Sequence, residues 1–197
     1  MRRKTFDALV SVAGLVLAVV LLVAGGLLVW GHSFVHNQVH NQLAAQKIVF
    51  PAANSPEIKA LPASDATAMK QYAGQLMTNG AQAETWADHF IAVHLVKIGG
   101  GQTYSQLSGK AIAQPTNVAL ANQVNLVFRG TTLRGLLLNA YAFWKMGQIA
   151  LWAAIVSFIG AGLLLIFSAI GFWHTTRTSP ESEVLYKLAA TEKVTTA

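Results

Sequence analysis

Three histidines near the start of the chain, His32, His36 and His40, fall four residues apart. This spacing places them on one face of a helix, where two histidines one turn apart can bind zinc if a third ligand folds over them. Glu84 and Asp88 are the carboxylates that would supply it. The alternative is the polar face of a helical stalk, because amides lie between the histidines and no His-Glu-x-x-His motif is present. We therefore expect no bound metal and no cofactor, and keep His36, His40, Glu84 and Asp88 as the candidate ligands.

A second group of cations and aromatic rings precedes the long apolar run near the C-terminus. Its members are Arg129, Arg134, Tyr141, Trp144 and Lys145. Tryptophan, tyrosine and basic side chains are typical of the interface between a membrane and water. These residues either bind anionic lipid head groups or form a surface on which a partner protein docks. Both alternatives stay open at the level of sequence.

No catalytic motif can be singled out. The chain has no cysteine, so it has neither a disulfide nor a thiolate ligand or nucleophile. The run Gly99–Gly101 precedes a predicted helix but lacks the lysine of a phosphate-binding loop, so it is better interpreted as a helix stop. No Ser-His-Asp arrangement stands out. The sequence therefore favours a protein that is not an enzyme.

The composition indicates a membrane protein. Of the 197 residues, 53% are hydrophobic and 11% are charged, whereas a soluble domain carries about 25% charged residues. The formal net charge of +6 is scattered along the chain. A nucleic-acid-binding protein would gather its basic residues on one face, so we expect no nucleic-acid partner.

Two uncharged apolar runs, residues 8–30 and 147–173, are each long enough to cross a bilayer, for which about 20 residues suffice. Neither contains an ionisable residue, which argues against a proton or ion pathway. The basic cluster Arg2–Lys4 favours a cytoplasmic N-terminus. The first run is longer than the apolar part of a signal peptide and no Ala-x-Ala site follows it. We therefore expect an uncleaved signal anchor.

These runs predict the overall class, an all-α membrane protein. Its two transmembrane helices, with both termini inside, flank a mostly helical extracytoplasmic domain. The basic N-terminus (1–7) and the tail (174–197) are then cytoplasmic, and residues 31–146 are outside. The long middle segment carries more basic than acidic residues, but long domains cross the membrane largely regardless of charge. We expect a plasma-membrane location.

Periodicity and capping residues predict the helices of the middle segment. We expect a stalk over His32–Lys47 and then an extended connector over 52–64, which is rich in proline. The further expected helices are Ala66–Met77, capped by Ser64 or Asp65 and stopped at Thr78–Gly80; Ala81–Ile98; Tyr104–Ile112, capped by Thr103; and Asn117–Phe128. Arg129 and Gly130 are expected to interrupt the chain before the final helix. In the tail, Ser179 is expected to cap a short helix.

Small residues recur on one face of each apolar run, namely Gly14 and Ala18 in the first and Ala153, Ser157 and Ala161 in the second. Small side chains let two membrane helices approach closely. We expect them either to pack the two anchors together or to dock another membrane protein.

Three segments, Ala87–His94, Gly99–Leu107 and Phe128–Trp144, resemble an uncharacterised actinobacterial family of two-span membrane proteins. The resemblance covers most of the chain except the tail, and it implies an envelope location. Members of that family often carry the label "aromatic ring-opening dioxygenase". Such an enzyme needs two histidines and one carboxylate around Fe(II), and this sequence shows no motif for that set.

Three functions are consistent with these features. The first is an accessory component of an envelope or membrane protein complex, which contacts membrane lipids and another membrane or envelope protein. The alternative is an extracytoplasmic sensor that binds a ligand or lipid in a pocket among Trp86, Phe90, Tyr104 and Phe128. The third is a metal-dependent enzyme.

Overall fold

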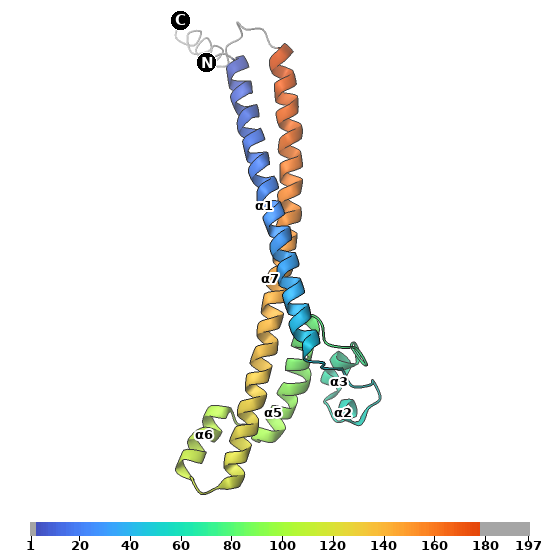
Figure 1. The fold of residues 1–197 in the computed structure, drawn as a ribbon, viewed down its shortest axis with the longest axis vertical. Coiled ribbons are helices and arrows are strands. Elements are labelled where there is room, and N and C mark those ends of the chain that lie inside the picture. The colour runs from blue at the N-terminus through green and yellow to red at the C-terminus, as the bar shows by residue number, and fades with distance from the viewer. Residues whose placement is uncertain (1–2, 178–197) are drawn as a thin grey trace, which may run out of the picture. The chain divides into compact units, whose positions relative to one another are not determined.

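The computed structural model describes residues 3–177, and its regular elements are helices (Figure 1). The tail helix expected from Ser179 lies outside the described residues. In chain order the elements are α1 (Arg3–Ala45), α2 (Pro56–Lys59), α3 (Ala63–Lys70), α4 (Gly80–Trp86), the π-helix η1 (Ala87–Ile91), α5 (Ala92–Gly99), α6 (Tyr104–Ala113) and α7 (Val118–Arg177). The predicted all-helical fold is confirmed.

The chain divides into two units. The first, here called the paired-helix unit, combines residues 1–30 with 150–197, and the second, the central unit, is Gly31–Ile149. In the paired-helix unit the first part of α1 and the last part of α7 lie side by side and run in opposite directions (Figure 1). Both helices are long and apolar enough to cross a membrane. Most of their large apolar side chains are exposed rather than packed in a protein core.

A seam of small residues joins these two helices. Ser11 and Ala18 are buried on α1, and Ala154, Ala161 and Ser168 are buried on α7, so each helix buries positions seven residues apart. A seven-residue repeat keeps one face against a neighbouring helix when the two cross at a shallow angle. The buried positions of the seam therefore follow a seven-residue repeat, which is an average period of 3.5 residues.

Of the small residues predicted for this contact, those that match the seven-residue repeat lie in the seam and one that does not is exposed. Ala18 and Ala161 are buried in the seam, and Ser157 is half-buried. A β-carbon at Gly14 would lie 2.5 Å from Ser168 Oγ, so Gly14 permits the close approach. Ala153 is exposed. The prediction that the contact recurs every four residues is wrong at Ala153. A face with a period of 4 residues drifts around the helix away from a contact whose period is 3.5 residues.

In the central unit α1 continues as a helix to Ala45, which confirms the predicted stalk over all but its last two residues. Lys47 then adopts a left-handed conformation with φ 54°, and Pro51 follows four residues later. A left-handed residue just past the last turn is a common way to end a helix. The stalk helix therefore ends because of residues that follow it directly in the sequence.

The connector that was expected to be extended contains a helical turn, α2. Ser55 accepts a hydrogen bond from the Ile58 amide, and Pro56 occupies the first helical position, where its missing N–H costs nothing. A hydrogen bond from the Glu57 backbone amide, and then one from the Ser55 hydroxyl, lower the pKa of the Glu57 carboxyl. Ile58 is fully buried, so the turn places one apolar anchor in the core.

The predicted helix Ala66–Met77 is wrong at both ends. It begins earlier, as α3 at Ala63, and ends at Lys70. Residues 71–74 form turns. The backbone is extended from Gln75 onward, where Phe50 donates to Gln75 and Met77 donates to Ile48. After these turns, long-range hydrogen bonds of residues 74–77 with Ile48 and Phe50 replace a continued helix.

Asn79 begins a helix instead of ending one, which corrects the predicted stop at Thr78–Gly80. Its side chain accepts from the Gln82 amide at 3.0 Å, and Gln82 Oε1 accepts from the Asn79 amide at 3.3 Å. This reciprocal pair is a capping box. The predicted helix Ala81–Ile98 is present as α4, η1 and α5, and Gly100 ends it with φ 59°.

The helix α6 begins after Thr103, as predicted. Its capping box pairs the Thr103 hydroxyl with the Gln106 amide at 3.3 Å. The predicted break at Arg129–Gly130 is wrong, because α7 runs unbroken from Val118 to Arg177. A β-carbon at Gly130 would lie 2.6 Å from Leu95 Cδ2. Gly130 therefore permits a close contact with α5 and does not break the helix.

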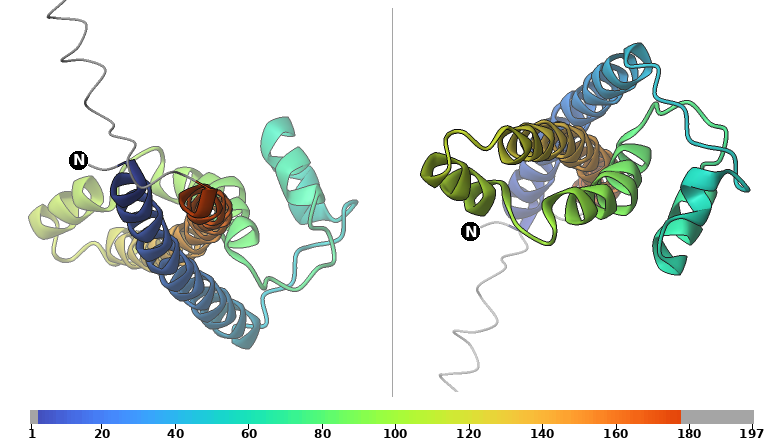
Figure 2. Two further views of the ribbon diagram at one scale, coloured as in Figure 1. Left: turned by 90° about the horizontal axis from the view of Figure 1, so that it is seen from above. Right: turned by 90° about the horizontal axis from the view of Figure 1, so that it is seen from below.

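The core of the central unit gathers apolar side chains from most of its elements. α5 lies between α7 on one side and α2 and α3 on the other (Figure 2). The five largest fully buried side chains of the described residues are Phe50, Ile58, Met69, Met77 and Leu107. Four of them come from residues 50–77, so this segment, which contains α2 and α3, supplies most of the largest buried side chains.

Candidate functional site

The central unit contains an apolar groove of about 720 Å³. One wall is the last part of α1, the opposite wall is the middle of α7, and Trp86 and Ile91 contribute from α4 and η1. The lining residues are Phe34, Val35, Gln38, Val39, Gln42, Leu43, Gln46, Ile48, Trp86, Ile91, Leu133, Leu136, Leu137, Asn139, Ala140 and Phe143. Ligand sites in proteins commonly have volumes of roughly 300–1,000 Å³ and mostly apolar linings. This groove has both properties.

The α1 wall alternates apolar side chains with a row of amides. Gln38 and Gln42 lie four residues apart on α1, which places them along one line of the helix. Gln46 follows in the turn just after the helix ends at Ala45. No hydrogen bond joins their side chains to other residues that the structure describes. Each amide therefore offers its full set of two donor hydrogens and one acceptor oxygen.

The α7 wall presents large apolar side chains. Leu133, Leu136 and Phe143 are 56%, 60% and 58% exposed, although each is apolar and lines the groove. Leu137, by contrast, is nearly buried and belongs to the core. A contiguous exposed apolar patch is a mark of an interaction or ligand site.

An aromatic cluster fixes the inner end of the groove. Trp86 packs edge-on against Phe50, with ring centroids 5.0 Å apart, and lies 4.7 Å from the ring of Phe90. Aromatic pairs at these separations stabilise one another beyond the area they bury. The Trp86 ring is therefore positioned from two sides, and the groove has a preformed wall.

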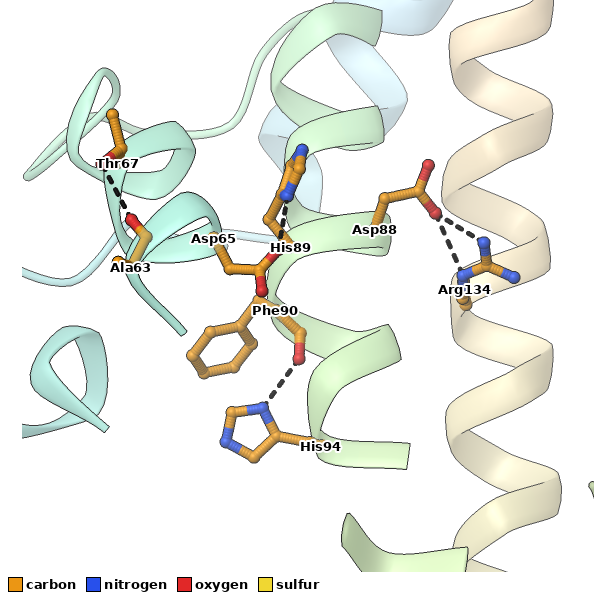
Figure 3. Close-up of polar contacts among 8 residues, drawn as sticks. All are labelled: Ala63, Asp65, Thr67, Asp88, His89, Phe90, His94 and Arg134. Atoms are coloured by element: carbon orange, nitrogen blue, oxygen red, sulfur yellow. Dashed lines mark hydrogen bonds and ion pairs between the residues drawn. The ribbon is translucent and has the colours of Figure 1, made fainter. Parts of the chain in front are cut away.

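One ion pair and one side-chain hydrogen bond hold η1 between α3 and α7 (Figure 3). Asp88 binds Arg134 of α7, and the next residue, His89, donates from Nδ1 to Asp65 of α3 at 2.7 Å. Consecutive helical residues point in directions about 100° apart. One turn of the π-helix can therefore bind both neighbours, which fixes Ile91 and Trp86 at the groove.

Two further histidines are oriented by backbone carbonyls. His94 Nδ1 donates to the Phe90 carbonyl at 2.7 Å (Figure 3), and His32 Nδ1 donates to the Gly147 carbonyl at 2.8 Å. Since a carbonyl only accepts, the proton lies on Nδ1 in both rings. His32 thereby joins α1 to α7 at one end of the central unit.

The residues predicted as a docking surface do not form one free cluster. Arg134 is bound to Asp88, and Trp144 packs against the N-terminal glycine of α4, Gly80. Tyr141 lies near the Trp144 ring, with centroids 6.4 Å apart. Arg129 and Lys145 are exposed, and neither forms an ion pair with a described residue.

The metal-ligand candidates are not assembled. No group of three histidine, aspartate or glutamate side chains among the described residues lies close enough to hold a metal ion. His36 and His40 are exposed, and the carboxylate of Asp88 binds Arg134. The rings of His32 and His36 lie near each other in a tilted arrangement, with centroids 5.9 Å apart. The Nδ1 atom of His32 is hydrogen-bonded to the Gly147 carbonyl.

The pocket expected among four aromatic residues is only partly present. Trp86 lines the groove, whereas Phe90 lies behind it; Tyr104 and Phe128 pack against each other, 5.4 Å apart, and do not line it. The sequence predicts that the amides between the histidines form the solvated face of a stalk, but Gln38 lines the groove. The four-residue spacing of the glutamines that line the groove, on an otherwise apolar stripe, is the sequence signal that could have indicated it.

Comparison with known proteins found no match to this chain among family models, curated proteins or solved structures. The resemblance to a family of two-span proteins therefore stays a prediction. Any proposal on function has to start from the groove.

Proposed function

We propose that this chain is an integral membrane protein that binds an apolar chain, such as the acyl chain of a membrane lipid, in the groove of its central unit. The observation that carries the proposal is a 720 Å³ groove whose lining has no ionisable side chain. Enclosing apolar surface is favourable by about 25 cal/mol per Å² removed from water. An alkyl chain in the groove would gain this free energy of burial without leaving a buried charge unpaired.

The two long walls favour a lipid as the occupant. Both are parts of helices that are long and apolar enough to cross a membrane. The α1 wall from Phe34 to Leu43 is about 14 Å long at a rise of about 1.5 Å per residue. One leaflet of a bilayer core is about 15 Å thick, half of roughly 30 Å. An extended acyl chain therefore matches the wall in length.

The topology we propose has both termini in the cytoplasm and the central unit on the extracytoplasmic face of the plasma membrane. The basic N-terminal cluster supports it, because such clusters are retained inside. Since the chain has no native cysteine, single cysteines can be placed without background. A membrane-impermeant maleimide added to intact cells should label Asn54→Cys and leave Thr176→Cys unlabelled. The reverse pattern would overturn this topology.

Photolabelling tests the proposed ligand. A diazirine-bearing long-chain fatty-acid methyl ester, which has no charge, is added to the full-length protein in phosphatidylcholine nanodiscs. Irradiation should attach it to peptides of the two walls, read by mass spectrometry. Ala140→Trp should suppress this labelling by filling the groove, because Ala140 lines it.

Ala142→Trp is the matched control. Ala142 is exposed, lies two residues away on the same helix and does not line the groove. It should leave the labelling unchanged. Labelling confined to the paired-helix unit, or equal labelling in both variants, would refute the groove as a lipid site.

A second candidate is an accessory component that docks a partner protein. It is favoured by exposed apolar side chains on α6 and at the start of α7, where Ile112 is 79% and Val118 is 71% exposed. Charged substitutions at both sites should release a partner that co-purifies with the wild type in mild detergent. If the partner stays bound to the double variant, these residues are not the docking surface.

A further inference from the structure

We propose that the groove selects a lipid whose head group is uncharged and forms hydrogen bonds, such as the hydroxyls of a glycerol ester, and discriminates against a phosphate. This inference rests on the proposed function, that an apolar chain occupies the groove. It adds the chemical class of the head group.

The polar groups of the lining are all uncharged. The lining contains four amide side chains and one indole, those of Gln38, Gln42, Gln46, Asn139 and Trp86. No lysine, arginine, histidine, aspartate or glutamate lines the groove. A carboxamide both donates and accepts hydrogen bonds, as a hydroxyl group does. The amide row therefore matches a head group with several hydroxyls.

The cation next in sequence to the lining residue Leu133 is already neutralised. Arg134 follows the lining residue Leu133, but its guanidinium donates twice to Asp88. A phosphate at the groove would meet no free cation among its lining residues and would lose part of its hydration. Removing an unpaired charge from water is strongly unfavourable. The groove therefore disfavours an anionic head.

The amides are arranged to serve one ligand. Gln38 and Gln42 lie one turn apart on α1, and Gln46 follows in the turn after the helix ends at Ala45. All three line the same groove as the apolar side chains of Val35, Val39 and Leu43. A chain lying on the apolar positions would keep its head within reach of at least one amide. The central member, Gln42, is the residue on which the selection depends most.

Three photoreactive probes with one common diazirine chain test this. They are a monoacylglycerol, the same molecule carrying a phosphate, and the methyl ester as a reference for the chain alone. Each is presented to the full-length protein in phosphatidylcholine nanodiscs. We expect the monoacylglycerol to label the groove most strongly and the phosphate about tenfold less, a difference of about 1.4 kcal/mol.

Variants identify the amide. Gln42→Leu should reduce monoacylglycerol labelling to the level of the methyl ester, and Gln42→Lys should raise labelling by the phosphate. Asn41→Leu is the matched control, because Asn41 is an exposed amide next along α1 that does not line the groove. It should change none of the three labels.

The outcomes separate the two proposals. If no probe labels the groove, the proposed function fails and the head-group selection fails with it. If all three probes label equally, the groove binds chains but does not select the head, and only this inference is overturned. Equal effects of Gln42→Leu and Asn41→Leu would also overturn it.

Discussion

Asp88 Oδ1 accepts two hydrogen bonds from the guanidinium of Arg134, at 2.6 Å from Nη2 and 3.1 Å from Nε. The pair joins η1 to α7 across 46 positions of sequence. Both side chains are about one-third exposed, so solvent weakens the attraction. The pair positions the π-helix beside the groove more than it stabilises the fold.

A double-mutant cycle measures this pair. Arg134→Met and Asp88→Asn, alone and combined, should give a coupling free energy of about 0.5–1 kcal/mol, because the pair is partly solvated. Thermal unfolding of the full-length protein in one detergent provides the values. Arg129→Met, on the same helix and exposed, is expected to change stability by less than about 0.5 kcal/mol. Additive single-variant effects would contradict the ion pair.

An engineered disulfide tests the seam of the paired-helix unit. A β-carbon at Gly14 would lie 3.9 Å from Ser168 Cβ, within the separation of about 3.5–4.5 Å that a disulfide spans. Gly14→Cys with Ser168→Cys should therefore form an intramolecular crosslink under mild oxidation. The crosslink is read as a mobility shift that reductant reverses.

The control for this crosslink moves one cysteine to the next residue. Ala169 is exposed, so Gly14→Cys with Ala169→Cys should crosslink poorly. Because native cysteines are absent, no other disulfide competes. Efficient crosslinking at 169 and not at 168 would restore the four-residue spacing predicted from sequence.

Gly80 allows α4 to meet α7 closely, since a β-carbon there would overlap the Cβ of Trp144 and lie 2.7 Å from its Cγ. Those atoms cannot move without shifting the α7 backbone or the indole. Gly80→Ala should lower the free energy of unfolding by about 1–3 kcal/mol. Hydrogen exchange in α4 should rise in step.

Gly135→Ala is the reference for Gly80→Ala. Gly135 lies inside α7, and an added β-carbon would meet nothing within 4 Å. Alanine in a helix is favoured over glycine by about 0.8–1 kcal/mol, so this variant should raise the unfolding temperature. Equal destabilisation by both substitutions would exclude the Trp144 contact as the cause.

The capping box at Asn79 gives a further test. Asn79→Ala removes the acceptor of the Gln82 amide and should cost about 0.5–2 kcal/mol. Asn79→Ser keeps a side-chain oxygen and should restore most of the stability. Unfolding temperature in detergent is again the measurement. If serine and alanine behave alike, the side chain of residue 79 does not cap α4.

The sequence by itself determined the features that depend on neighbouring residues. Two uncharged runs predicted two long apolar helices, which is confirmed. The Thr103 cap of α6 and the glycine stop of α5 were also predicted correctly. Capping and periodicity act over about one helical turn. The residues that decide them therefore lie side by side in the sequence.

Only the tertiary structure decided the features that depend on residues far apart in the chain. Gly130 lies against Leu95 within the unbroken α7. After α3 ends at Lys70, residues 74–77 form hydrogen bonds with Ile48 and Phe50. The groove needs both α1 and α7, whose lining residues are about a hundred positions apart. Packing between distant segments overrides local preference, so a line of amides that looked like a solvated face became the wall of a candidate binding site.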